Sequence, residues 1–202
     1  MKKNKLKYAV TFLVIVISLN MTTSWTFAEQ IETEQVIAPN YVDYTLLDIP
    51  TYKQERDRWC WAATSQMVIS HLGGNKTQSQ IVRYVKGKII NEGAKDKEVI
   101  SGLNWAGLSA TRTNGIITFG KIVSQISANQ PILAHINWKN ESDLGHMVVI
   151  RGFYNYTETG QRDVYYKDPA QNRTTNRVMS YAEFDENWEF FWYTTIHSIY
   201  VM

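Results

Sequence analysis

The order of hydrophobic and polar positions divides the chain into a helical first half and a strand-rich second half. From Cys60 to Leu72, apolar residues recur every three to four positions, which is the spacing of one helix face. The glycine pair after Leu72 would end this helix. Shorter patterns of the same kind predict helices over about 77–86, 96–106 and 118–129, with Asp96 as an N-cap.

After Pro131, β-branched and aromatic runs replace the helical spacing. They predict strands over residues 132–138, 146–154, 164–167 and 191–201. A short edge strand over 46–49 and one helix within 180–188 complete the pattern. Helices followed by strands, without regular β-α-β alternation, indicate an α+β fold with an antiparallel sheet. The two halves are expected to pack as lobes with a cleft between them.

The first 28 residues have the pattern of a secretory signal peptide. A lysine-rich start leads into an apolar run over 9–19 and then a polar stretch that ends at Ala28. As a helix, this run would span about 17 Å, short of the ~30 Å hydrocarbon core. An uncleaved signal anchor is the alternative. We expect a secreted, extracellular protein, cleaved after about Ala28 and with no membrane association afterwards.

The remaining chain predicts a single domain. Residues 29–45 are polar and acidic, and we expect a flexible N-terminus or a short pro-segment there. Residues 46–202 are long enough to form one folded domain with its own core.

Charge and composition exclude several classes of protein. Hydrophobic residues make up 44% and charged residues 20% of the chain, as in ordinary globular proteins. Loss of the four lysines of the signal segment would change the formal net charge from +2 to −2. Without a basic stripe, nucleic acid is not expected as a partner. The histidines and the cysteine lack the spacing of metal ligands, so we expect no metal or other cofactor.

Cys60 is the single cysteine of a chain that we expect to be exported. Such a thiol could form an intermolecular disulfide, be inert and buried, or act as a nucleophile. Cys60 falls at the predicted start of a helix, where free N–H groups and the helix dipole favour a thiolate. The nucleophile hypothesis therefore requires a base.

Four histidines are available as that base. His71 lies eleven residues further along the same predicted helix, ~16 Å from Cys60 along the axis and out of reach. His135 and His197 lie inside strand-like runs, where structural roles are common. His146 follows a glycine where a long loop meets a strand, so it would be presented at the sheet edge. A histidine at a strand start is also often structural.

Two further polar residues could complete such a site. Asp168 ends a predicted strand just before Pro169, and it could be a simple turn residue. If the neighbouring strand carries His146, Asp168 could instead accept a hydrogen bond from its Nδ1–H. Gln54 lies six residues before Cys60, and its amide could donate to an oxyanion.

Together, three segments resemble the papain-like cysteine peptidases, and most closely their compact bacterial branch, the C39-like and AvrRpt2-type (C70) peptidases. The segments are Gln54-x5-Cys60-Trp61-Ala62, Gly145-His146-x-Val148-Val149-Ile150-x-Gly152 and Asp168-Pro169. The resemblance extends over about residues 48–200. It departs from the larger papain-type enzymes, because His146 follows Cys60 by 86 residues rather than about 130–150 and the third member is Asp.

The resemblance implies a two-lobed α+β papain-like fold, with a helical N-terminal lobe, an antiparallel-sheet C-terminal lobe and the active site between them. It implies Cys60 as nucleophile, His146 as general base and then acid, and Asp168 as the residue that orients His146. Gln54 and the backbone N–H of Cys60 would stabilise the oxyanion.

The hypothesis that follows is a secreted cysteine endopeptidase that acts on a protein or peptide substrate. We expect a monomer, and, since no long inhibitory pro-region precedes the core, we allow for a separate inhibitor protein as a partner. The first alternative is an acyl or peptidyl transferase, or a cell-wall peptide hydrolase, that uses the same triad. The second is a non-catalytic exported binding module with the same shape.

Overall fold

The structure is a computed structural model that describes residues 42–140, 145–173 and 175–202. The predicted signal peptide over 1–28 and the following residues 29–41 lie outside the described part of the chain. Within that part, no helix is both long and apolar enough to cross a membrane.

The described residues form helices and strands largely in the predicted order. The helices are α1 (Cys60–His71), α2 (Gln78–Lys86), α3 (Asp96–Trp105), α4 (Phe119–Ser127) and α5 (Tyr181–Asp185). The strands are β1 (Val42–Leu46), β2 (Leu108–Asn114), β3 (Ile132–Trp138), β4 (Gly145–Tyr156), β5 (Arg162–Lys167), β6 (Asn176–Ser180) and β7 (Phe190–Val201).

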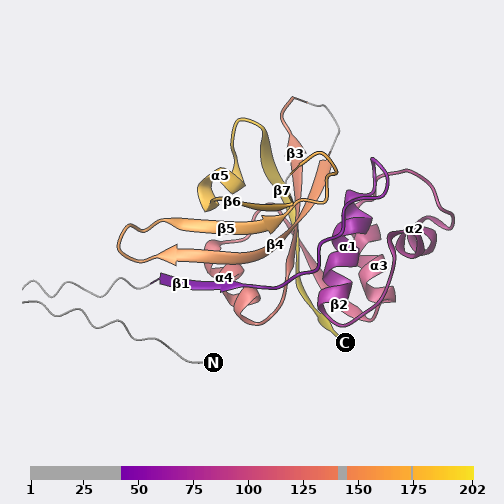
Figure 1. Cartoon of the computed structure of the whole chain (residues 1–202), viewed down its shortest axis with the longest axis horizontal. Helices are drawn as coiled ribbons and strands as arrows, with labels where there is room; N and C mark the ends of the chain where they lie inside the picture. The colour runs from indigo at the N-terminus through magenta and orange to yellow at the C-terminus, as the bar shows by residue number, and fades with distance from the viewer. Residues whose placement is uncertain (1–41, 141–144, 174) are drawn as a thin grey trace, which may run out of the picture. The chain divides into compact units, whose positions relative to one another are not determined.

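All described strands belong to one antiparallel sheet with the order β2-β7-β3-β4-β5-β6, and β1 pairs with the second half of β4. Helices α1, α2 and α3 pack on one another, and this group contacts the sheet through α1 on β4 and α3 on β2. Figure 1 shows the group beside one end of the sheet, whereas β4 and β5 extend away from it. The predicted α+β fold with an antiparallel sheet is confirmed.

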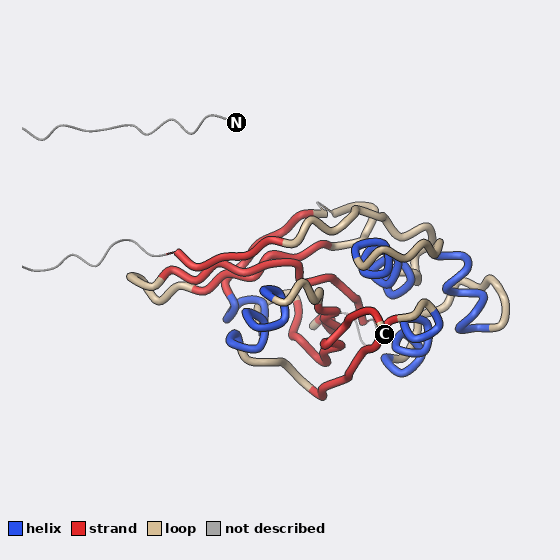
Figure 2. Tube along the Cα trace, turned by 90° about the horizontal axis from the view of Figure 1, so that it is seen from below, coloured by secondary structure: helices blue, strands red, loops and turns tan. Residues whose placement is uncertain are grey.

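A single hydrophobic core joins the helices to the sheet. Helix α1 lies at its centre, since eight of its residues are buried, among them Ala62, Met67 and Val68. A helix that is buried on most sides is typical of the middle of a fold, not its surface. Seen from below in Figure 2, the helices of this group lie to the right of the strands. The first residue of α1, Cys60, is therefore held against the sheet.

Three strands differ from the sequence-based expectation. Residues 42–45, which we placed in a flexible segment, belong to β1 and pair with β4, while the edge strand expected over 46–49 overlaps β1 only at Leu46. Strands β2 and β6 were not predicted, because both are short of apolar residues. Strands β1, β2 and β6 are partly exposed. They are held by backbone hydrogen bonds, β1 to β4, β2 to β7 and β6 to β5.

Candidate active site

Two buried tryptophans hold Cys60 in place at the first turn of α1. Trp59 precedes the helix and makes no side-chain capping bond, so the N–H groups of the first turn are not used by a cap. The indole N–H of Trp59 donates to the Ile90 carbonyl (2.8 Å), and that of Trp61 donates to the Glu92 carbonyl (3.0 Å). Both contacts fix the Cys60 turn to the loop between α2 and α3.

The surroundings of Cys60 favour its thiolate form. Burial raises the pKa of a thiol, but here the hydrogen bond and positive charge of His146 outweigh burial. The backbone N–H groups of Met147 and Trp61 act in the same direction. The pKa of Cys60 consequently lies below its ordinary value, as a nucleophilic cysteine requires.

His146 is the second residue of β4 and lies opposite Ile136 of β3. Its side chain is largely buried, and its ring stacks on Trp138 with 5.7 Å between ring centroids and an angle of 26° between the planes. Burial alone would lower the pKa of His146. Hydrogen bonds to Asp168 and Cys60 and the charges of both groups instead raise it to about 9.

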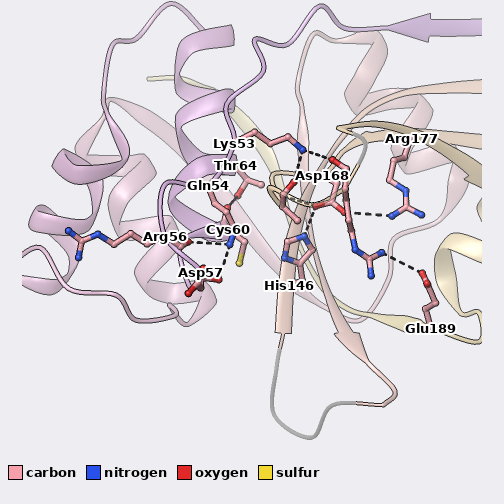
Figure 3. Close-up of polar contacts among 12 residues, drawn as sticks. Lys53, Gln54, Arg56, Asp57, Cys60, Thr64, His146, Asp168, Arg177 and Glu189 are labelled. Atoms are coloured by element: carbon pink, nitrogen blue, oxygen red, sulfur yellow. Dashed lines mark hydrogen bonds and ion pairs between the residues drawn. The ribbon is translucent and has the colours of Figure 1, made fainter.

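Asp168 follows β5, the strand next to β4, so the sheet brings it to His146. Its Oδ1 lies 2.8 Å from Nε2 of His146 and also accepts the backbone N–H of Ala170 (2.9 Å). Burial tends to raise the pKa of this carboxyl, but the hydrogen bond and charge of His146 hold it below the ordinary value. Figure 3 shows His146 between Cys60 and Asp168.

One detail of the expected histidine geometry is wrong. We expected Asp168 to accept from Nδ1–H, but it is Nε2 that faces the carboxylate. The reason is the direction in which β4 presents the ring, with Nε2 towards the end of β5. Nδ1 is thereby left as the nitrogen that can face the thiol of Cys60.

Gln54 is largely buried in the loop before α1. Its amide Nε2 donates to the backbone carbonyls of Arg56 (3.1 Å) and Asp57 (2.8 Å), while its Oε1 has no hydrogen-bond partner among the described residues. Figure 3 shows both contacts beside Cys60. The amide hydrogens of Gln54 are thus directed at the loop before α1. Its oxyanion role stays a prediction.

The loop before Cys60 is fastened to the loop after Asp168. The backbone N–H of Gln54 donates to the Pro169 carbonyl (2.9 Å), and the side chain of Gln171 donates to the Gln54 carbonyl (2.8 Å). Lys53 Nζ donates to the carbonyls of Ala170 and Arg173. These bonds tie the segment that carries the nucleophile to the segment that carries the carboxylate.

Two cavities meet at His146. The larger, about 660 Å³, is lined by both Cys60 and His146. The smaller, about 280 Å³, is lined by Gln54 and His146, with the exposed indole of Trp188 at its rim. Trp138 and His146 line both cavities.

A second histidine–aspartate pair beside the cleft was not foreseen. Nδ1 of His135 lies 3.0 Å from Oδ1 of Asp96, and Oδ2 of Asp96 accepts from Arg112 Nε (2.7 Å) and Thr194 Oγ1 (2.6 Å). We expected Asp96 to cap α3, but Lys95 is the N-cap and the carboxylate turns to these partners. No local signal indicates the pair, because its members lie 39 residues apart.

The requirement for glycine at position 145, directly before His146, is steric. A Cβ atom on Gly145 would lie 2.1 Å from Nε2 of His135, so no larger residue fits while that ring is there. His135 also lines the larger cavity. The ring of His135 therefore supports the start of β4, immediately before the catalytic candidate.

The two other histidines lie outside the site. His71 contacts Asn129 (2.9 Å), and His197 contacts Thr113 (2.8 Å). Neither lines the two cavities. The sequence-based choice of His146 over these histidines agrees with this arrangement.

Residues 46–196 match the profile of the Peptidase_C39 like family. The chain belongs to this family. A search of curated proteins found no significant sequence match. Family and fold together identify a papain-like cysteine peptidase, and the C39-like resemblance is confirmed, whereas the AvrRpt2-type relationship stays a prediction.

Several solved structures share the fold. A putative C39-like peptidase from Bacillus anthracis is 14% identical, with a TM-score of 0.57 over 79% of this chain and 100% of that one. A double glycine motif protease from the AMS/PCAT transporter, in complex with a leader peptide, is 20% identical (TM-score 0.53; 78% and 95% covered). Xylellain, a cysteine protease from Xylella fastidiosa, is 10% identical (TM-score 0.53; 79% and 86% covered). At these identities, the likenesses show the fold alone.

Proposed function

We propose that the chain is a secreted cysteine endopeptidase in which Cys60, His146 and Asp168 form the catalytic triad. The observation that carries the proposal is the position of His146, which joins a thiol of lowered pKa to a buried carboxylate at the meeting point of two cavities. Perturbed pKa values and a cleft together mark functional sites. Two cavities that share His146 and Trp138 in their linings suit a substrate that extends to both sides of the cleaved bond, as a peptide does.

In the first half of the reaction, the Cys60 thiolate attacks the carbonyl carbon of a peptide bond. The carbonyl electrons move onto oxygen and return as the C–N bond breaks. The protonated His146 gives its proton to the leaving amine, and the acyl group stays on sulfur as a thioester. His146 then takes a proton from water, whose oxygen attacks the thioester, and Cys60 leaves as thiolate.

Asp168 keeps His146 in the productive orientation and stabilises its charged form through the bond to Nε2. The negative oxygen that forms during attack would be met by the backbone N–H of Cys60 and by Gln54. Since Gln54 bonds Arg56 and Asp57, it would have to exchange the longer bond, 3.1 Å to Arg56, for the substrate oxygen. Replacement of Gln54 by Ala is then expected to lower kcat by roughly 10²-fold.

The proposal is tested with a mixture of peptides and mass spectrometry of the products. Wild-type protein should release new peptide N-termini, and Cys60→Ser, which keeps the size of the side chain, should release none. Amine incorporation into the acyl product, in place of hydrolysis, would instead identify a transferase. A protein that leaves every peptide intact, with an unreactive Cys60, would contradict an enzymatic role.

Secretion is proposed from the sequence of residues 1–28. Expression of the whole chain in a secreting bacterial host, followed by N-terminal analysis of the protein in the medium, tests it. The expected first residue is Glu29. A chain retained in the membrane with Met1 intact would contradict the proposal.

A further inference from the structure

The larger cavity carries an uneven distribution of charge. Basic and acidic residues that line it are Arg58, Lys86, Lys95, Lys97, Asp57 and Glu98. Lys86 and Glu98 pair with each other at 2.9 Å. Apart from the Cys60–His146 pair, whose charges are opposite, the charges that remain are the cations of Arg58, Lys95 and Lys97 and the carboxylate of Asp57. This excess of positive charge lies beside Cys60, although the chain after residue 28 has a formal net charge of −2.

The three remaining cations are open to solvent at the cavity. Arg58, Lys95 and Lys97 are exposed, and within the described residues none of them forms an ion pair. By contrast, the floor of the cavity includes apolar side chains that are half-buried and that a ligand can reach, Ala94 and Trp138. A side chain with an apolar stem and an acidic end matches this combination of floor and rim.

The reaction assigns the two cavities to different halves of a peptide. The acyl half of the substrate stays on Cys60, and the amine half departs with the proton of His146. The larger cavity is lined by Cys60 and His146, whereas the smaller is lined by His146 without Cys60. The larger cavity therefore takes the acyl half, which is the part N-terminal to the cleaved bond.

We propose that the protein prefers peptides with Asp or Glu a few residues N-terminal to the cleaved bond, because Arg58, Lys95 and Lys97 bind the acidic side chain. The inference rests on the proposed peptidase function and deepens it by naming a substrate class. Because the three cations are exposed, their contribution falls as ionic strength rises.

The first experiment digests a complex peptide mixture with the wild-type protein and maps the cleaved bonds by mass spectrometry. Enrichment of Asp and Glu at one or two positions on the N-terminal side is the expected result. Synthetic peptides that differ only in Glu, Gln or Lys at that position then give kcat/KM. The order Glu, Gln, Lys is expected, and the difference should shrink in high salt.

The second experiment reverses one charge in the cavity. Lys97→Glu should lower kcat/KM for the Glu peptide by about fivefold and raise it for the Lys peptide. Lys121→Glu on α4, outside both cavities, is the matched control and should change neither value. The pKa of Cys60, read from the pH dependence of its alkylation, should stay well below the ordinary value in both variants, because His146, Met147 and Trp61 lower it and neither lysine does.

The outcomes separate this inference from the proposed function. Cleavage without any acidic preference, or equal effects of Lys97→Glu and Lys121→Glu, would overturn the inference and leave the peptidase intact. Absence of cleavage by wild-type protein would overturn the proposed function and this inference with it.

Discussion

Two histidine–aspartate pairs lie at the cleft, and their histidines belong to neighbouring strands, β4 and β3. His146 of β4 bonds Asp168 at 2.8 Å, and His135 of β3 bonds Asp96 at 3.0 Å. Both histidines line the larger cavity, and both aspartates are buried. The residue types and distances are nearly the same, so neither can explain why one pair would be catalytic.

The difference lies in what else each pair contacts. His146 has the Cys60 thiol as its other partner, and each raises the charged fraction of the other. Asp96 accepts from Arg112 and Thr194 as well as from His135, so its carboxylate joins α3 to β2 and β7. In this protein, a histidine–aspartate pair alone therefore has a structural role, and a catalytic role also requires a nucleophile beside the histidine.

The largest expected effect distinguishes the two histidines by activity. His146→Ala removes the proton donor for the leaving amine, so kcat/KM should fall by roughly 10³-fold. His135→Ala leaves the triad intact, and kcat/KM should stay within about tenfold of wild type. Steady-state hydrolysis of one peptide by both variants is the measurement. Equal losses would mean that the comparison is wrong.

The aspartate of the second pair, Asp96, is expected to contribute to stability. Asp96→Ala leaves Arg112, Thr194 and His135 without their acceptor, which should lower the free energy of unfolding by about 3 kcal/mol. Urea unfolding near neutral pH checks this. Burial tends to raise the pKa of Asp96, but the hydrogen bonds from His135, Thr194 and Arg112 lower it further than burial raises it. The ionised carboxylate therefore stabilises the fold fully at pH values above the pKa of an unfolded aspartate, near ~3.9. This stabilisation should be lost as the pH falls through the pKa of Asp96 in the folded protein.

Asp168→Asn tests the orienting residue of the other pair. Without the carboxylate, the charged form of His146 loses its main support, and kcat should fall by roughly 10²-fold. In wild type, the pKa of His146 near about 9 predicts that activity declines on the alkaline side as the pH rises through that value. In the variant this decline should move to lower pH. A pH profile of kcat/KM for both proteins would show the shift, and an unchanged alkaline limb would contradict it.

The smallest effect concerns the contact between the two histidine-bearing strands. Gly145→Ala would place a Cβ atom against the ring of His135, which should destabilise the protein by about 2 kcal/mol. In a His135→Ala background the same change should cost much less, because the obstructing ring is gone. A double-mutant cycle by thermal or urea unfolding measures this coupling. If the losses of unfolding free energy in the two single variants add up to that of the double variant, the ring of His135 is not the reason for a glycine at position 145.

The triad candidates could be predicted from sequence because each stands at an element boundary and because together they resemble the motifs of the papain-like peptidases. Cys60 begins a helix, His146 begins a strand and Asp168 ends one, so their places follow from the element boundaries. The nitrogen that faces Asp168 could not be predicted, since it depends on how β4 presents the ring.

The rest of the cleft depends on contacts that leave no local pattern. Asp96 begins a helix and its position suggests a cap, while its partners come from three strands, β2, β3 and β7. Strands β2 and β6 have few apolar residues, so periodicity does not reveal them. In each case, pairing between distant segments overrides the local preference.

The central claim is that His146, and not His135, activates Cys60. It is tested most directly by the pH dependence of Cys60 alkylation, followed by intact mass, in wild type, His146→Ala and His135→Ala. An ordinary thiol titrates near ~8.5. The expected result is a thiol that reacts with a pKa well below this value in wild type and in His135→Ala, and a raised pKa in His146→Ala. An unshifted wild-type thiol, or the same rise in both variants, would contradict the claim.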